Sequence, residues 1–280
     1  MHRTLKKYFP IFVLPTLIAF TIAFLIPFIM GLYPSFTKFT TISHSRWVGF
    51  SNYIKAFSNQ DFVNAFFFTS KFTIVSVITI NVLAFILAMI LTRGLRGTNM
   101  FRTVFFMPNL IGGIVLGYIW QLIINGVLAN FGYDITYDAK FGFWGMVILM
   151  NWQLIGYMMI LYIAGIQNIP TDLIEAARID GAKGHQILRK ITLPLIMPSI
   201  TICLFLTLTN SFKLYDQNLA LTAGKPGRET AMIALDISNT FYNRNGWEGV
   251  GQAKAVLFFL MVAVIALTQL LITRRKEVEH

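Results

Sequence analysis

Six long runs of apolar residues alternate with polar connections along the chain. The runs are Ile11–Leu32, Phe66–Leu91, Val104–Ile124, Phe143–Ile166, Leu195–Thr209 and Ala255–Ile272. Because an α-helix rises about 1.5 Å per residue, roughly twenty apolar residues cross a hydrocarbon core of about 30 Å. The pattern therefore predicts an all-α integral membrane protein with six transmembrane helices, the fifth of which should extend beyond its run at one or both ends.

The composition supports this prediction. Of the 280 residues, 56% are hydrophobic and only 12% are charged, whereas a soluble domain typically carries about 25% charged residues. The net charge of +11 could suggest nucleic-acid binding. The basic residues lie beside the apolar runs, however, and form no stripe with interleaved aromatic residues. We therefore expect a protein that contacts membrane lipid and no nucleic acid.

Few residues could hold a metal or act as a nucleophile. The one cysteine, Cys203, lies in an apolar run, and the four histidines lie outside the runs with no two at metal-ligand spacing. The single cysteine excludes an internal disulfide framework and a cysteine metal cluster, and neither haem nor zinc is expected. An intramembrane enzyme is disfavoured as well, because Cys203 has no histidine in any run to act as its base.

The first apolar run could belong to a cleaved signal peptide. Its basic start, with Arg3, Lys6 and Lys7, fits that alternative. The run is longer than the roughly 7–15 residues of a signal-peptide core, and no small-x-small cleavage site follows. We therefore predict that it is retained as a spanning helix.

The placement of lysine and arginine predicts the orientation. The basic connections contain Arg3, Lys6 and Lys7; Arg93, Arg96 and Arg102; Arg178, Lys183, Arg189 and Lys190; and Arg274, Arg275 and Lys276. They alternate along a six-span chain, so they belong on one side of the membrane, and short basic connections face the cytoplasm. Both termini and the connection after the fourth run should be cytoplasmic. The connections at about 33–65, 125–142 and 210–254 should lie outside.

Charged residues are scarce within the runs. Lys71 lies near the outer end of the second, where its long stem can carry the ammonium group to the interface. A charge at the middle of the bilayer costs at least about 2.5–3.5 kcal/mol, a cost that ion-coupled carriers commonly accept to hold the coupling ion. The scarcity indicates that the energy source lies in another subunit.

Prolines and glycines interrupt several runs, among them Pro15, Pro27, Pro108 and Pro198. Proline lacks a backbone donor and bends a helix. Ordinary membrane packing is the favoured interpretation of these residues, and the alternative is that Pro108 supports a kink during conformational change. Gly113 and Gly117 form a small-x-x-x-small pair, which permits close approach of two helices.

A polar, helix-prone segment separates the fourth and fifth runs. Thr171 is a plausible N-cap, with acidic side chains in the first turn near the positive helix end. Gly181 and Gly184 bracket a turn, and Ile187 begins a second amphipathic helix, after which Pro194 marks the return to the membrane. The segment should form two short helices joined by a sharp turn, projecting toward the cytoplasm.

The same segment resembles the cytoplasmic loop motif of binding-protein-dependent ABC importer permeases. The motif is E-A-A, three residues, G, nine residues, I-x-L-P, and the matching residues are Glu175, Ala176, Ala177, Gly181, Ile191, Leu193 and Pro194. Other stretches are similar to the sugar-transporting, maltose-type permeases: Trp47–Tyr53, Leu95–Gly97, Phe101–Pro108 and Leu221–Pro226. In the last, Lys225 replaces the more usual glycine. The missing glycine-rich tail favours the first, F-like permease of a heterodimer.

The resemblance covers nearly the whole chain and implies its fold and function. A type I ABC importer permease fold would make residues 1–280 a single transmembrane domain, with a peripheral first helix (11–32), a core at about 66–273 and a coupling loop at about 169–194. The function implied is that of the permease subunit of an ATP-driven sugar importer, with oligosaccharide the favoured cargo, working by alternating access. The phosphate-binding pattern G-x-x-x-x-G-K-[ST] is absent. We therefore expect no enzyme activity and no bound cofactor in this chain.

The implied partners follow from the family. They are a second homologous permease, two ABC ATPase subunits that use ATP and Mg²⁺, an extracellular solute-binding protein and the sugar, all at a prokaryotic cytoplasmic membrane. The residues that the resemblance assigns to ATPase coupling are Glu175, Ala176, Ala177, Asp180 and Gly181.

For the cargo, polar and aromatic residues near the fourth and fifth spans are the candidates. They are Asn151, Gln153, Tyr157, Asn210, Tyr215 and Asp216, accompanied by Trp152 and Phe212. Sugars bind to aromatic faces and to amide and carboxylate groups in a mostly preformed cavity. The alternative role of each is interhelical hydrogen bonding or interfacial anchoring.

Two other transport functions stay open at this point. An ion-coupled secondary carrier would need intramembrane ionisable groups or repeat symmetry, and the sequence offers neither. An ABC permease for a non-sugar cargo such as glycerol-phosphate would use a similar subunit. A purely structural scaffold would leave the full loop motif unexplained.

Overall fold

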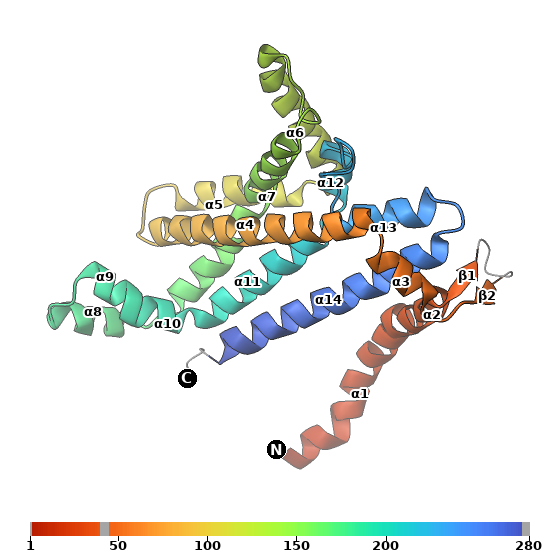
Figure 1. Cartoon of the computed structure of the whole chain (residues 1–280). Helices are drawn as coiled ribbons and strands as arrows, with labels where there is room; N and C mark the ends of the chain where they lie inside the picture. The colour runs from red at the N-terminus through yellow and green to blue at the C-terminus, as the bar shows by residue number, and fades with distance from the viewer. Residues whose placement is uncertain (1, 40–44, 276–280) are drawn as a thin grey trace. The chain divides into compact units, whose positions relative to one another are not determined.

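The computed structural model describes residues 2–39 and 45–275, with side chains from Phe9 onward (Figure 1). The chain divides into two compact units. One comprises the residues up to Phe62 together with Ile237–Phe258, and the other comprises Val63–Asp236 and the residues from Phe259 onward. The predicted single transmembrane domain with a peripheral first helix stays a prediction.

Within the described residues, five helices are long and apolar enough to cross a membrane, or six if one bent pair counts as a span. They are Phe9–Ser35, Gln60–Leu91, Gly113–Phe131, Ala139–Gln167 and Glu248–Arg274, and the bent pair is Gly184–Leu195 with Met197–Phe212. This confirms the predicted all-α membrane fold. The cytoplasmic placement of both termini stays a prediction.

The first span is longer than its apolar run and contains a wider turn. It runs from Phe9 in α1 (His2–Phe20) through the π-helical turn η1 (Thr21–Leu25) to the end of α2 (Ile26–Ser35). Pro27 has no N–H to donate to the carbonyl of residue 23, and the π turn lies where that bond would have been. A proline inside an apolar run is thereby accommodated without ending the span.

A short hairpin and helix follow the first span in the same unit. They are β1 (Thr37–Phe39), β2 (Ser45–Trp47) and α3 (Ser51–Phe57), with Thr37 paired antiparallel to Trp47. The buried Asn52 side chain donates to the carbonyls of Ser35 (2.9 Å) and Thr37 (2.8 Å). Asn52 therefore ties α3 to the end of the span, which gives the Trp47–Tyr53 stretch a structural role.

A buried lysine corrects the expectation for the last span. The helix α14 (Glu248–Arg274) begins before the predicted Ala255 and so includes Lys254, which is fully buried. Its Nζ donates to Asn59 Oδ1 (3.0 Å) and Thr240 Oγ1 (2.8 Å) and lies 5.2 Å from the centre of the Phe62 ring. These contacts offset the cost of burying an ammonium group.

The second unit is built around α7 (Ala139–Gln167), the most buried of the candidate spans. It packs with α4 (Gln60–Leu91), α5 (Thr98–Phe106) and α11 (Met197–Phe212). Asn81 on α4 donates to Thr207 Oγ1 on α11 (2.9 Å) and accepts from the Tyr162 hydroxyl of α7 (2.8 Å). Interhelical hydrogen bonds of this kind join helices within a membrane.

The third predicted span, Val104–Ile124, is interrupted and therefore wrong in its bounds. The helix α5 gives way to a 3₁₀ turn, η2 (Met107–Leu110), and to extended backbone before α6 (Gly113–Leu128) begins. Pro108 lacks a donor, and adjacent glycines are poor helix formers. The apolar span is Gly113–Phe131 instead. Whether the break moves during transport stays a hypothesis.

Candidate functional site

The segment predicted to couple to an ATPase forms two short helices, α8 (Thr171–Ile179) and α9 (Gly184–Ile187), and the second begins at Gly184, before the predicted Ile187. The N-cap is Pro170 rather than Thr171, which is the first helical residue. The chain continues through a π turn, η4 (Leu188–Thr192), and α10 (Leu193–Leu195). These short helices gather at one end of their unit, away from α12 (Asp216–Leu221), which lies at its other end (Figure 1).

Gly181 allows α8 to end in a sharp reversal. Its φ is +78°, its N–H donates to the carbonyl of Arg178 (3.0 Å), and Ala182 N–H donates to the carbonyl of Ala177 (2.9 Å). This bond pair is the Schellman motif, in which a left-handed residue follows the C-cap. A Cβ at Gly181 would meet no atom within 4 Å. The backbone conformation alone therefore demands glycine here.

The two faces of α8 differ. Ile174 packs against the core of the unit, whereas Leu173 and Ile179 are exposed, Ile179 to 86%. The predicted coupling residues Glu175, Ala176 and Asp180 are also exposed, and Ala177 is half-buried. The helix thus presents an exposed face of apolar, small and acidic side chains.

The fifth span begins with a bend. The helical stretches Gly184–Leu195 and Met197–Phe212 meet at 70°. Ile196 lies at the bend outside helical geometry, with φ −93° and ψ 8°. The expectation that the fifth run extends beyond Leu195–Thr209 is confirmed, and the extension leads directly into the segment with α8 and α9.

A polar cavity of about 420 Å³ lies near the other end of the unit. Its lining residues come from η2, α7, the end of α11 and α12, and are Asn109, Met150, Gln153, Leu154, Tyr157, Asn210, Lys213, Leu214, Tyr215, Asp216 and Gln217. The volume is within the range of small-molecule sites. Eight of the eleven side chains carry a polar group, which suits a ligand rich in hydroxyl groups.

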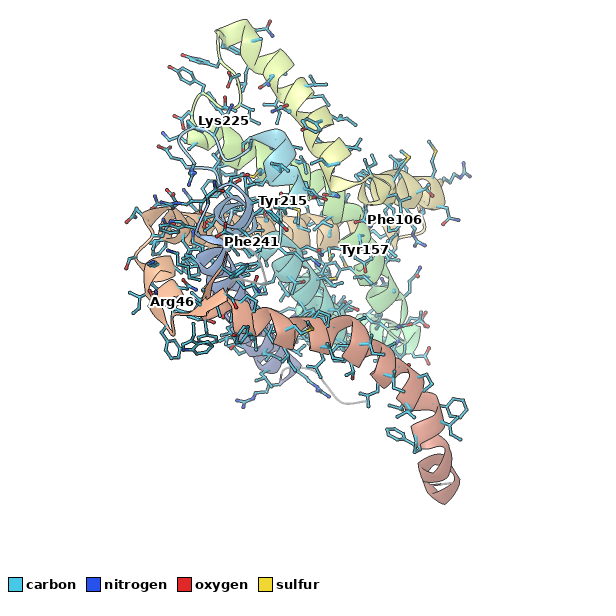
Figure 2. All side chains as sticks on the ribbon, turned by 90° about the vertical axis from the view of Figure 1, so that its right-hand side faces the viewer. Arg46, Phe106, Tyr157, Tyr215, Lys225 and Phe241 are labelled. Atoms are coloured by element: carbon cyan, nitrogen blue, oxygen red, sulfur yellow. The ribbon has the colours of Figure 1, made fainter. Side chains whose placement is uncertain are left out.

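Five of the six predicted cargo residues share this cavity: Gln153, Tyr157, Asn210, Tyr215 and Asp216. Tyr157 lies on α7, and Tyr215 is the residue directly before α12 (Figure 2). Asn151 does not line it. Its Nδ2 donates to Thr79 Oγ1 on α4 (2.9 Å) and to the carbonyl of Val147 (2.8 Å), the interhelical role weighed as its alternative.

Close packing of α6 on α12 positions one wall of the cavity. A Cβ added at Gly113 would lie 2.9 Å from Asp216 Cβ, and one at Gly117 would lie 2.6 Å from Ala220 Cβ. The predicted close approach at these glycines is confirmed, with the short α12 as the partner. Across the cavity, Gln217 Nε2 donates to Gln153 Oε1 (2.8 Å). An amide pair thus joins α12 to α7.

A buried asparagine anchors the other side of α12. Asn218 donates to the carbonyl of Thr230 (2.8 Å) and to Thr222 Oγ1 (3.1 Å), and its Oδ1 accepts from Met232 N–H (2.9 Å). The turn of the Leu221–Pro226 motif is held by these bonds, with Gly224 at φ +81°. This motif therefore fixes the cavity wall and contributes no lining residue.

Sequence reasoning missed three polar lining residues: Asn109, Lys213 and Gln217. Asn109 lies in the break after Pro108. The prediction of a continuous third span, Val104–Ile124, had placed it inside a helix. Lys213 and Gln217 adjoin candidates that were named, so their proximity to Asp216 was the available signal. In the described part of the chain, no three His, Cys, Asp or Glu residues are grouped as metal ligands would be.

Comparison with known proteins agrees with the motif and the fold. Residues 80–278 match the family described as binding-protein-dependent transport system inner membrane component. A probable starch degradation products transport system permease of Thermoanaerobacterium thermosulfurigenes is 46% identical, covering 96% of this chain and 94% of that protein. An sn-glycerol-3-phosphate transport system permease of Agrobacterium fabrum is 30% identical, with 91% and 90% covered.

A solved structure shares the fold. A bacterial alginate ABC transporter, in complex with an alginate pentasaccharide-bound periplasmic protein, has a chain that superposes with a TM-score of 0.78 at 22% identity, covering 98% of this chain and 97% of that one. The sequence match and this superposition, together with the apolar helices, identify the chain. It belongs to the family of binding-protein-dependent transport system inner membrane components and is a multi-pass membrane permease subunit with the type I ABC importer fold.

Proposed function

We propose that this chain is the first, F-like permease of a heterodimeric ATP-driven importer of neutral oligosaccharides. The polar cavity between α7 and α12 carries the proposal. Amide, hydroxyl and carboxylate groups there can exchange hydrogen bonds with sugar hydroxyls, while Tyr157 and Tyr215 offer aromatic faces. The relative that transports starch degradation products, at 46% identity, supports the same cargo class.

The charges of the cavity favour a neutral cargo over glycerol-phosphate. One carboxylate, Asp216, and one ammonium group, Lys213, line it, and no excess of positive charge is present to balance a phosphate dianion. A phosphate beside Asp216 would meet a like charge in a partly enclosed site. The glycerol-3-phosphate permease is also the more distant relative, at 30% identity.

The energy is supplied by partner subunits in this proposal. The helix α8 and the turn after it, with Glu175, Ala176, Ala177, Asp180 and Gly181, would enter a groove on one of two ABC ATPase subunits, which bind ATP and Mg²⁺. Closing of the ATPases would move α8, and the bend at Ile196 would pass that motion to α11. Reversing a 1:99 conformational preference takes about 5.5 kcal/mol of differential interaction, which ATPase closure can supply.

The remaining assembly follows from the family. A second homologous permease completes the pathway, and an extracellular solute-binding protein delivers the cargo, as the periplasmic protein in the alginate transporter suggests. The permease pair lies in a prokaryotic cytoplasmic membrane with α8 on the cytoplasmic side. This chain binds no cofactor of its own and hydrolyses no ATP.

Asp216→Ala tests the cavity in the complete transporter reconstituted in vesicles. A hydrogen bond to a charged group contributes about 1.5–3 kcal/mol, so we expect sugar uptake to fall roughly 10- to 100-fold. The ATPase rate without sugar should stay unchanged, because α8 lies away from the cavity. Asp134→Ala is the matched control, since the exposed Asp134 does not line the cavity and accepts hydrogen bonds from Thr136 in its own loop.

Uptake kinetics and ATPase rates decide the outcome. Equal sugar uptake by Asp216→Ala and the control would show that the cavity is not the sugar-binding site. A loss of the sugar-free ATPase rate in Asp216→Ala would assign the residue to coupling or to folding instead.

A further inference from the structure

A second cavity, of about 600 Å³, lies beside α8 on the side opposite its exposed face. It is formed where the ends of α4 and α7 meet α8 and α9. Its walls are mainly apolar, with Met89 from α4, Ile166 from α7, and Ile174 and Ile187 from the two short helices. The polar cavity described above shares no lining residue with it.

Two arginines give this cavity its charge. Arg93 follows the end of α4 and Arg178 lies on α8, and both line the cavity, whose lining includes no aspartate or glutamate. Both side chains are exposed, and within the described part of the chain neither guanidinium makes an ion pair. A guanidinium group donates paired hydrogen bonds that match phosphate geometry. The charge therefore selects an anion, with phosphate as the fitting group.

The position of the arginines relates the cavity to the membrane surface. The apolar helix α4 ends at Leu91, two residues before Arg93, so Arg93 lies at the depth of lipid headgroups. Met89 and Ile166, which line the same cavity, belong to the ends of the apolar spans. A ligand that fits both parts has an anionic head and an apolar tail. Cytoplasmic leaflets rich in anionic lipid offer such molecules.

We propose that this cavity binds the phosphate headgroup of an anionic phospholipid and holds α8 against the ends of α4 and α7. Ile174 and Arg178 are four residues apart and so lie on one face of α8, the face turned from the proposed ATPase contact. The lipid would set the position of α8 before an ATPase engages it. This inference rests on the cytoplasmic orientation in the proposed function.

The test measures lipid binding directly in the purified complete transporter. Short-chain phosphatidylglycerol is titrated in detergent, and the bound lipid is counted by native mass spectrometry, which also reports subunit assembly. The double variant Arg93→Gln/Arg178→Gln should bind phosphatidylglycerol about thirtyfold more weakly, the effect expected from removing two basic residues at the membrane surface. Arg96→Gln/Arg189→Gln removes the same charge from neighbouring positions outside the cavity and should bind as the unaltered protein does.

Two further probes, phosphatidylcholine and inorganic phosphate, distinguish an anionic lipid from other sources of phosphate. Phosphatidylcholine should bind weakly to every variant, and inorganic phosphate should fail to displace phosphatidylglycerol, because it cannot occupy the apolar part. Equal binding of phosphatidylcholine, displacement by inorganic phosphate, or equal weakening in the control pair would each overturn the proposal. Sugar uptake is not the readout, so a negative result leaves the proposed transport function untouched.

Discussion

At the scale of single residues, glycine serves two separate physical needs in this protein. Gly181 occupies a left-handed backbone conformation in open space, whereas Gly156 has ordinary helical geometry but no room, since a Cβ there would overlap the carbonyl of Phe105. A side chain at Gly181 therefore costs conformational energy, roughly 1–2 kcal/mol. A side chain at Gly156 would instead push α5 from α7.

Gly181→Arg should leave membrane insertion intact and uncouple ATP hydrolysis from sugar uptake. The added side chain has space, but it disturbs the Schellman turn and projects where an ATPase would grip α8. Gly132→Arg is the control, because Gly132 has a similar φ of +76° and equally open surroundings in a distant loop. Both ATPase rate and uptake are measured in the reconstituted transporter. Normal uptake by Gly181→Arg would argue strongly against the coupling role.

At the scale of elements, the contact between α6 and α12 determines the cavity wall. The contact depends on Gly113 and Gly117, which let a short polar helix approach a membrane helix closely enough for Gln121 Nε2 to donate to the carbonyl of Leu221 (2.9 Å). Small residues permit such approach within a bilayer. A change in this contact should therefore affect both stability and cargo.

Gly117→Ala should destabilise the protein by about 1–3 kcal/mol, the cost of overpacking, and lower sugar uptake. Gly126→Ala, on the same helix, places a methyl group where no atom lies within 4 Å. It gains the helix propensity of alanine, roughly 1 kcal/mol, without a clash and should be neutral or stabilising. Thermal unfolding in detergent compares the two. Equal stability of both variants would mean that α12 is not packed on α6 as described.

At the scale of the whole molecule, the proposed mechanism depends on which side of the membrane each connection faces. The basic connections predict that α8 lies in the cytoplasm and that the connection around residues 125–142 lies outside. One buried cysteine, Cys203, is the only thiol in the sequence. It should react slowly with polar reagents, so introduced cysteines can report on orientation.

Ala176→Cys should react with a membrane-impermeant thiol reagent only in inside-out vesicles, and Asn130→Cys only in right-side-out cells. Both native side chains are exposed in this chain, which makes them a matched pair. Addition of the ATPase subunits should protect Ala176→Cys and leave Asn130→Cys reactive. Labelling of Ala176→Cys from outside would exclude the coupling proposal.

The sequence by itself determined the membrane class, most of the spans, the two short helices around Gly181 and the family. These features depend on local apolar runs, on helix propensity and on the left-handed backbone that glycine can adopt. All three are properties of residues that are close together in the sequence. Tertiary structure decided the rest. Asn151 turned to Thr79 instead of the cavity, the third span broke after Pro108, and Lys254 became buried among Asn59, Phe62 and Thr240. Each of these features depends on contacts between residues that are far apart in the sequence. In a helix that is apolar on all sides, the sequence does not show which neighbour a polar side chain faces, because that is set by the packing of the other helices.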